Sequence, residues 1–227
     1  MQEKNIVLFD MDNTLVSANT GELWTTFLDQ KGILSPQDKK IFQEIHALYS
    51  EGKLDPNTGY EHLLSIMQKI PHHEKELWVE EFFHGMVKHK TSVKGLNLIK
   101  NHQEEPDTLV ILITASLSFV VSHVANHSGV HGFIATEGEI LEGKYTGKLS
   151  GVPCLGEGKI ARFEQWSQEN QIIPAHTTLY TDSINDLPLL NYVKKPIVVD
   201  PDKYLKQVAL EKNWDILSFL ETEDVSS

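Results

Sequence analysis

Cysteine is almost absent from this chain of 227 residues, which contains only Cys154. A single cysteine excludes an internal disulfide, and chains without disulfides are typical of reducing compartments. No basic segment followed by a long apolar stretch stands at the amino terminus, so we expect no secretory signal. The sequence therefore predicts a cytoplasmic protein.

Long hydrophobic runs and positive charge are also scarce. Stretches such as residues 108–113 are far shorter than the roughly 20 apolar residues that span a bilayer. Lys and Arg number 20 against 32 Asp and Glu, and the formal net charge is -12. Such a field repels polyanions, which argues against nucleic acid or an anionic membrane as a partner. A small anionic substrate would need local positive charge or a metal ion.

The remaining composition is that of a soluble globular protein, with 40% hydrophobic and 23% charged residues. The length is enough for one sizeable domain or for a domain that carries a smaller insertion. The sequence contains no internal repeat, no low-complexity linker and no signal for an oligomeric state.

The most informative stretch lies near the amino terminus, where four apolar residues lead directly to two aspartates. Residues 6–9 (IVLF) predict a short strand that is buried on both faces. Asp10 and Asp12 follow, and Asn13 and Thr14 come next. Carboxylates just past the carboxyl end of a buried strand lie where open α/β sheets bind ligands. A polar turn that only ends the strand is the alternative, since Asp and Asn favour turns.

A helical segment follows, from about residue 21 to residue 90. Apolar residues spaced by three and four positions predict several amphipathic helices, for example over residues 23–28. Ser35 and Pro36 fit the N-cap and the first position of one of them. A run of helices between two strands indicates an inserted helical cap.

From about residue 93 onward, predicted strands and helices alternate. Strands are predicted at residues 109–113, 131–135, 177–180 and 196–199, a β-hairpin at 137–151, and helices at 95–102, at 117–128, from 156 and from 202. Ser116 is placed to cap the helix that begins at residue 117. Strands that alternate with helices predict an α/β fold with a doubly wound parallel sheet.

Polar groups follow three of these strands. The groups are Asp10 and Asp12, then Thr114 and Ser116, then Asp182 and Asp186, with Lys159 at the start of a helix between them. Carboxyl ends of parallel strands face one edge of a sheet, so these groups can converge. Crowded carboxylates need a hard cation such as Mg²⁺. A carboxylate beside a metal-held phosphate can attack phosphorus, and a second carboxyl can protonate the leaving oxygen. The N–H groups at the start of a helix and the ammonium group of a lysine can bind the negative oxygens of a phosphate.

In order and spacing, these clusters resemble the four motifs of the haloacid dehalogenase superfamily. Residues 10–14 (DMDNT) resemble the first motif, DxDxT, and Thr114 the second; Lys159 resembles the third and residues 181–186 (TDSIND) the fourth. The resemblance extends over residues 5–199, and the helical insert is similar to the cap of the phosphoserine-phosphatase-like branch.

The resemblance implies a Rossmann-like core formed by residues 1–16 and 92–227 and an all-helical cap formed by residues 17–91. It also implies Mg²⁺-dependent hydrolysis of a small phosphorylated metabolite through an aspartyl-phosphate. The resemblance implies that Asp10 is the nucleophile and that Asp12 is the general acid and base. It implies that phosphate is bound by Thr114, Ala115, Lys159 and Asn185. It also implies that magnesium is coordinated by Asp10, the Asp12 carbonyl and Asp182, and that Asp186 supports these metal ligands. Capping of the following helix is the alternative for the last two aspartates.

Several positions depart from the phosphoserine phosphatases of that family. Ser183 stands where glycine is common, which narrows the backbone freedom there. Asn19 lies nine residues after Asp10, where those enzymes have a glutamate for the substrate amine. Their cap arginine has no counterpart, because the only arginine is Arg162, and Lys53 could replace it only as a point charge. Phosphoserine is therefore the second candidate substrate.

The pattern is more similar to a neighbouring branch of phosphatases, some of which act on histidinol phosphate. Residues 143–147 and 156–159 carry this resemblance. Histidinol phosphate has an amine and no carboxylate, which suits an acidic cap without arginine. The candidate substrate contacts are Asn19, Glu22 and Trp24.

Four other interpretations are weaker. The GEGK segment is not a P-loop, because Pro153 and Ile160 stand where that motif needs Gly and Ser or Thr. The 11 histidines show no spacing typical of a zinc site. A dehalogenase of the same fold would need neither a second aspartate nor magnesium, so the presence of Asp12 argues against that activity. A non-catalytic phosphometabolite-binding protein is the alternative of another class, and the presence of both Asp10 and Asp12 argues against it.

Overall fold

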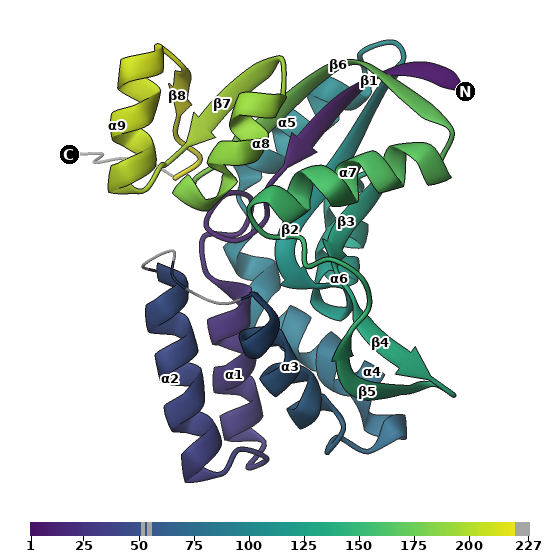
Figure 1. Cartoon of the computed structure of the whole chain (residues 1–227), viewed down its shortest axis with the longest axis vertical. Helices are drawn as coiled ribbons and strands as arrows, with labels where there is room; N and C mark the ends of the chain where they lie inside the picture. The colour runs from purple at the N-terminus through teal and green to yellow at the C-terminus, as the bar shows by residue number, and fades with distance from the viewer. Residues whose placement is uncertain (51–52, 54–55, 221–227) are drawn as a thin grey trace, which may run out of the picture.

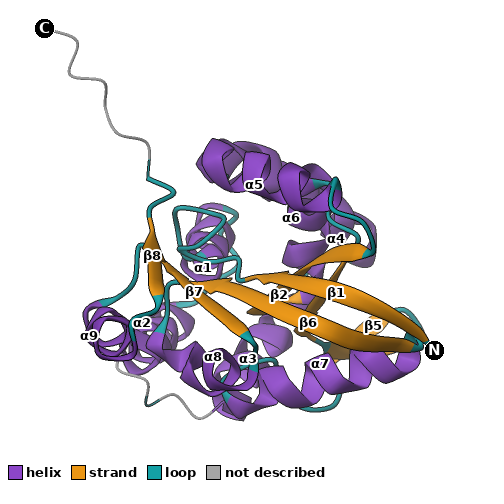
Figure 2. Cartoon of the chain, turned by 90° about the horizontal axis from the view of Figure 1, so that it is seen from above, coloured by secondary structure: helices purple, strands orange, loops and turns teal. Residues whose placement is uncertain are grey.

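Parallel strands form the sheet at the centre of the molecule (Figures 1 and 2). The computed structural model describes residues 1–50, 53 and 56–220. Within these residues the sheet has six strands in the order β3-β2-β1-β6-β7-β8, and each neighbouring pair is parallel. The strands are Gln2–Phe9 (β1), Thr108–Leu117 (β2), Gly132–Thr136 (β3), Ile172–Thr181 (β6), Lys195–Val199 (β7) and Asp215–Leu217 (β8). The predicted α/β fold with a parallel sheet is confirmed.

Helices cover both faces of this sheet, with α5 and α6 over one face and α7 and α8 over the other (Figure 2). The helices in this part of the chain are Val93–Gln103 (α5), Ser118–Ser128 (α6), Glu157–Glu169 (α7), Leu187–Tyr192 (α8) and Lys203–Lys212 (α9). Along β1, Val7 and Phe9 pack in one core cluster, whereas Ile6 and Leu8 pack in another. Burial on both faces explains the uninterrupted apolar run that precedes Asp10.

Within the described residues, four of the helices between β1 and β2 lie together in the lower half of Figure 1. They are Thr20–Gln30 (α1), Pro36–Ser50 (α2), Pro56–Met67 (α3) and His72–Phe82 (α4), followed by a π-helical turn at Phe83–Val87 and a 3-10 turn at Lys88–Lys90. The predicted helix start is confirmed, since α2 begins at Pro36 and the Ser35 hydroxyl accepts from the Asp38 N–H at 3.2 Å. The division into a core and a cap remains a prediction.

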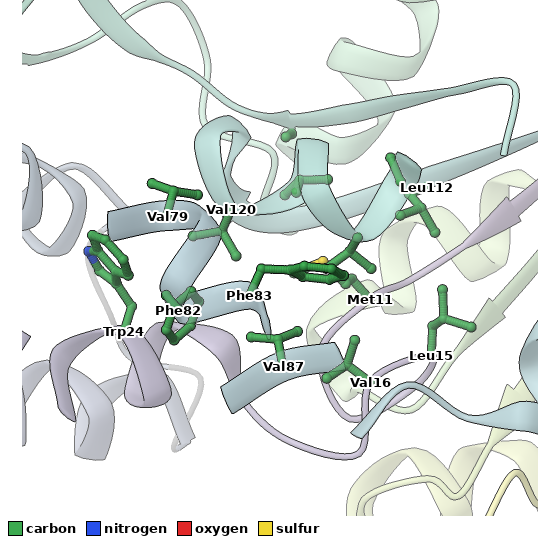
Figure 3. Close-up of a cluster of buried hydrophobic side chains, with 14 of the residues drawn as sticks. Met11, Leu15, Val16, Trp24, Val79, Phe82, Phe83, Val87, Leu112 and Val120 are labelled. Carbon is green, nitrogen blue, oxygen red and sulfur yellow. The ribbon is translucent and has the colours of Figure 1, made fainter. Parts of the chain in front are cut away.

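Buried side chains hold the loop that follows β1 (Figure 3). Met11, which lies between Asp10 and Asp12, is fully buried, and so is Leu15. Both belong to a cluster that includes Phe83 of the π-helical turn. Hydrophobic packing on either side of the turn therefore fixes the positions of the two aspartates.

The predicted hairpin is confirmed as two antiparallel strands, Gly138–Leu141 (β4) and Lys144–Leu149 (β5). It lies against α3, where Gln68 Nε2 donates to the Tyr145 carbonyl oxygen at 3.2 Å. Strand β8 was not predicted, because its three residues are all exposed and carry no apolar alternation. Of the helices in the described part of the chain, none has the length and apolar character needed to cross a membrane.

Candidate active site

The carboxyl ends of β2, β1 and β6 lie side by side, because β1 pairs in parallel with both neighbours. Asp10 follows β1, Asp182 follows β6, and Thr114 lies near the end of β2. The Thr14 hydroxyl donates to Asp182 Oδ1 at 2.9 Å and lies 3.5 Å from Asp10 Oδ2. The structure thus brings the first and last predicted clusters together at one edge of the sheet.

Lys159 joins two buried carboxylates. Its Nζ lies 2.8 Å from Asp10 Oδ1 and 2.6 Å from Asp186 Oδ2, and the lysine side chain is only 2% exposed. Burial lowers the pKa of Lys159, but the two carboxylates outweigh that effect and hold its pKa well above the ordinary value. The Thr181 hydroxyl also donates to Asp186 Oδ2, at 2.7 Å. Lys159 is therefore a fixed ammonium group beside the predicted nucleophile.

Two glycines place this lysine at the start of α7. Gly156 has a φ of +56°, a region that favours glycine. Gly158 lies so close to the carbonyl oxygen of Pro153 that a Cβ there would collide with it. Backbone geometry thus explains both glycines of the GEGK segment.

Asp10 and Asp182 are both buried close to other carboxylates. Burial raises the pKa of Asp10 to about 7 even though Lys159 opposes it, and burial together with the Asp10 charge raises the pKa of Asp182 to about 8. A bound cation would lower both values.

The oxygen atoms that Asp10 and its neighbours offer suit magnesium as ligands. In residues 1–50, 53 and 56–220, no group of three or more His, Cys, Asp and Glu side chains forms a metal site. The two carboxylates of Asp10 and Asp182 and the backbone carbonyl of Asp12 are hard oxygen donors. Mg²⁺ is commonly bound by one or two carboxylates and keeps several waters. The residues present therefore fit the ion that the sequence implies.

Asp12 has different partners from Asp10. Its Oδ1 accepts from the Thr20 N–H at 2.7 Å, and its Oδ2 accepts from the Ser116 hydroxyl at 2.5 Å. Burial raises the pKa of Asp12 above the ordinary value, although these hydrogen bonds oppose the rise. The start of α1 and the end of β2 thus orient this carboxyl, and its raised pKa suits a group that gives a proton and later takes one.

Ser116 does not cap α6, so this prediction was wrong. The N-cap residue of α6 is Leu117, which makes no side-chain capping bond. The Ser116 hydroxyl instead donates to Asp12 and lies 3.1 Å from the Thr20 hydroxyl. The Ser116 hydroxyl therefore bonds to Asp12, more than one hundred positions away in the sequence, and not to the backbone at the start of α6.

A small cavity of about 30 Å³ lies at the centre of these groups. Its lining consists of Asp10, Asp12, Asn13, Ala115, Leu155, Lys159, Asp182, Ser183 and Asp186. Thr114 is buried and accepts from the Ser116 N–H at 3.2 Å. Asn185 lines a neighbouring cavity of about 570 Å³ together with Asp182. The phosphate-binding roles of Thr114, Ala115, Lys159 and Asn185 stay predictions.

Capping does not account for Asp182 or Asp186. Asp182 accepts from Thr14, and Asp186 accepts from Lys159 and Thr181. Asp186 stands at the N-cap position of α8 but makes no side-chain capping bond, and Ser183 caps the preceding 3-10 turn. Both aspartates face the cavity.

The three predicted substrate contacts occupy different places. Trp24 lines a cavity of about 100 Å³ that also reaches Asp12. Glu22 lines the 570 Å³ cavity. Asn19 lines both, and its Oδ1 accepts from the Glu22 N–H at 3.1 Å, so that it caps α1. Local capping is therefore a sufficient reason for Asn19, whereas Trp24 and Glu22 stay candidates.

Sequence reasoning missed Tyr60. This residue of α3 donates from its hydroxyl to the carbonyl oxygen of Ala115 at 2.8 Å, and so joins the helical segment to the lining of the catalytic cavity. An aromatic residue in a helical apolar stripe is usually core packing. No local pattern shows that its hydroxyl reaches the end of β2, 55 positions away.

Replacing Tyr60 by phenylalanine is expected to lower kcat/KM for a phosphomonoester about 3- to 10-fold, the effect of one hydrogen bond. The reason is that the Ala115 carbonyl loses the donor that holds it. Tyr192→Phe is the matched control, since that hydroxyl donates to Glu164 at the surface at 3.1 Å. Equal kinetics for the two variants would show that the Tyr60 bond does not position the end of β2.

Comparisons with known sequences show the family to which the chain is similar. The family model for haloacid dehalogenase-like hydrolases matches residues 7–191. The chain is 31% identical over 225 residues to a histidinol-phosphatase of Neisseria meningitidis serogroup C, an alignment that covers 95% of this chain and 99% of that protein. It is 28% identical over 220 residues to a phosphoserine phosphatase of Mycobacterium tuberculosis, covering 93% of this chain and 70% of that protein.

Solved structures share the fold. A Bordetella pertussis protein of unknown function superposes with a TM-score of 0.89 at 29% identity, covering 96% of this chain and all of that one (100%). A phosphoserine phosphatase solved as a phospho-aspartyl intermediate analogue superposes with a TM-score of 0.67 at 20% identity, covering 97% and 95%. At that identity the second likeness concerns the fold alone.

Proposed function

This chain belongs to the haloacid dehalogenase-like hydrolase family as a phosphatase, and we propose that it hydrolyses a small phosphorylated metabolite with Mg²⁺ through an aspartyl-phosphate. The observation that carries the proposal is the pair of carboxylates after β1. Asp10 is held by Lys159, whereas Asp12 is held by Ser116 and the start of α1. Two carboxyls in such different surroundings can divide the roles of nucleophile and acid–base group.

In the first step, a carboxylate oxygen of Asp10 attacks phosphorus, and the bond between phosphorus and the ester oxygen breaks. Asp12 gives its proton to the departing alcohol oxygen. Lys159 stays protonated and offsets negative charge on Asp10 and on the transferring group. Magnesium, held by Asp10, Asp182 and the Asp12 carbonyl, would neutralise the phosphoryl oxygens.

In the second step, water attacks the phosphorus of the aspartyl-phosphate. Asp12, now ionised, takes a proton from that water, and the bond between phosphorus and the Asp10 oxygen breaks. Inorganic phosphate leaves, and both aspartates return to their starting states. The hydrogen bonds from Ser116 and Thr20 keep the Asp12 carboxyl facing the same place in both steps.

The substrate proposed is histidinol phosphate. The Neisseria relative carries that activity in its name. None of the described residues that line the 100 Å³ cavity beside Asp12 is a lysine or arginine, so a substrate carboxylate would have no cation there. Arg162, for its part, donates to the Ala135 carbonyl at 3.0 Å. Phosphoserine is the second candidate, because the Mycobacterium relative is named for it. The buried free thiol of Cys154 suits a reducing, cytoplasmic setting.

A panel of phosphomonoesters with Mg²⁺ tests the proposal. Histidinol phosphate is expected to have the highest kcat/KM, ahead of phosphoserine and p-nitrophenyl phosphate. A lead of orders of magnitude for phosphoserine would contradict the substrate. Binding of phosphorylated metabolites without any turnover would favour the non-catalytic alternative.

Removal of magnesium is expected to abolish activity, and its return to restore it. Because a ligand that binds only the folded state stabilises it, Mg²⁺ at about 100 times its Kd should add about 2.7 kcal/mol to the free energy of unfolding. Asp182→Asn should lose most of this gain, measured as the change in Tm with Mg²⁺. The control is Asp107→Asn, a change at an exposed aspartate, which should keep the gain in full. An undiminished gain in Asp182→Asn would remove Asp182 from the metal site.

A further inference from the structure

Phe219, which lies just beyond β8, meets the loop that carries the catalytic aspartates. Its side chain is only 7% exposed and belongs to the same core cluster as Leu15. Leu15 lies in the loop after β1, directly after Thr14, and is fully buried (Figure 3). A residue near the carboxyl terminus thus packs in the same place as a loop near the amino terminus.

Gly95 of α5 marks the point where the two side chains come together. A Cβ at this position would lie 2.7 Å from Leu15 Cδ1 and 3.3 Å from Cδ2 of the Phe219 ring. The first distance is shorter than a real Cβ tolerates, so only glycine leaves room for both side chains. Glycine is unfavourable inside a helix, and this close approach explains its presence in α5.

Hydrogen bonds hold Phe219 in this place. Its N–H donates to Asp200 Oδ2 at 2.7 Å, and its carbonyl oxygen accepts from the Ser92 hydroxyl at 3.1 Å. The Ser92 N–H donates in turn to the Leu15 carbonyl oxygen at 2.8 Å. Ser92 therefore joins the backbone of the catalytic loop to the segment that follows β8.

The neighbour of Leu15 lies between the two carboxylates that are proposed to bind magnesium. The Thr14 hydroxyl donates to Asp182 Oδ1 at 2.9 Å and lies 3.5 Å from Asp10 Oδ2. Thr14 and Phe219 also line one cavity of about 250 Å³, so side chains do not completely fill the space beside the loop. Beside a cavity the loop has fewer packing contacts, which gives more weight to the contact that Phe219 supplies.

We propose that Phe219 is a positioning residue of the active site. By packing at Leu15 it fixes the Thr14 hydroxyl and, through that hydroxyl, the places of Asp10 and Asp182. The inference rests on the proposed phosphatase function, and it adds a residue from outside the four motifs to the parts that prepare the magnesium site. Phe219 acts only through the loop, because it is not part of the lining of the catalytic cavity.

Phe219→Ala tests the contact by removing the ring. The Kd for Mg²⁺, measured by calorimetry without substrate, is expected to rise about 3- to 10-fold, the effect of one lost hydrogen bond at Thr14. The kcat for p-nitrophenyl phosphate at a fixed, limiting concentration of Mg²⁺ should fall in parallel. Phe219→Leu keeps a buried apolar side chain at this place and should return the Kd to within about twofold of the wild type.

The matched control is Leu28→Ala, which removes a fully buried side chain near the end of α1. Both alanine variants remove core packing, so the Tm of each should fall by roughly 5–15 °C. Only Phe219→Ala should change the Kd for Mg²⁺. This comparison separates support of the active site from general stability of the fold.

Gly95→Ala tests the same contact from the other side and removes no side chain. The added methyl group is expected to displace Leu15 and to raise the Kd for Mg²⁺ about 3- to 10-fold, although alanine favours a helix more than glycine does. Gly85→Ala is its control, because a Cβ at Gly85 would meet none of the described atoms within 4 Å. That variant should keep the wild-type Kd.

A wild-type Kd for Mg²⁺ in Phe219→Ala or in Gly95→Ala would overturn the inference. An equal rise in Leu28→Ala would overturn it too, because Phe219 would then only stabilise the fold. The comparison of Kd values does not need turnover. A wild-type protein that binds Mg²⁺ but hydrolyses no phosphomonoester would therefore refute the proposed function, while a rise in Kd confined to Phe219→Ala and Gly95→Ala would still support the positioning role.

Discussion

Replacing Asp10 by asparagine is expected to lower kcat for phosphomonoesters by about 10⁴-fold or more, as the loss of a catalytic nucleophile does in other enzymes. The amide has nearly the same shape as the carboxylate but cannot attack phosphorus. Lys159 still has Asp186 as a partner at 2.6 Å, so the site should remain assembled. Histidinol phosphate should therefore still bind to the variant, which calorimetry can measure.

The matched control for this change is Asp107→Asn. Asp107 is exposed, pairs with Lys4 at the surface and has a φ of +55°, a conformation that asparagine also tolerates. This variant should keep full activity. Turnover by Asp10→Asn at a rate near that of the wild type would discard Asp10 as the nucleophile, whatever the fold of the variant.

Replacing Lys159 by methionine is expected to have the second large effect, on both stability and rate. The substitution keeps much of the side-chain length but leaves Asp10 and Asp186 buried without the ammonium that joins them. Breaking a buried ion pair in this way costs about 3–5 kcal/mol. For a chain of this length that corresponds to a fall in Tm of roughly 10 °C. The activity should also fall by about 10²- to 10³-fold, because charge on the transferring group is no longer offset.

Lys4→Met provides the comparison, since Lys4 pairs with Asp107 at 2.8 Å at the surface. Solvent screens such a pair, so the change in Tm should be small and the activity unchanged. If Lys159→Met and Lys4→Met melted at the same temperature, the buried network around Lys159 would not hold the active site together.

Local patterns predicted those parts of the fold that depend on local causes. The run at residues 6–9 is apolar because β1 is buried on both faces, and burial of that kind leaves a direct trace in the sequence. The start of α2 was predicted from Ser35 and Pro36, since a cap involves neighbours only. The common edge of the strands followed from parallel topology, and it brought Asp10 and Asp182 together.

Long-range partners account for what was missed. The hydroxyl of Ser116 had a plausible local role as a cap, but Asp12 takes it in the folded chain. No local pattern marks Tyr60, whose hydroxyl reaches the Ala115 carbonyl only in the folded chain. Trp24 was a candidate for substrate contact, yet only the structure shows that its N–H is buried and unsatisfied among the described residues. These contacts depend on which segments meet in the folded chain, and no single stretch of the sequence encodes that information.

The central claim is that Asp10 takes the phosphoryl group, and trapping of that group tests it most directly. Asp12→Asn should slow the second step, in which a base is needed, while p-nitrophenol leaves readily without an acid. Mixing this variant with radiolabelled p-nitrophenyl phosphate and Mg²⁺, quenching in acid and mapping the peptides should give a burst of nitrophenolate and label on the peptide that contains Asp10. Label on another residue, or wild-type turnover with neither burst nor label in the variant, would contradict the account.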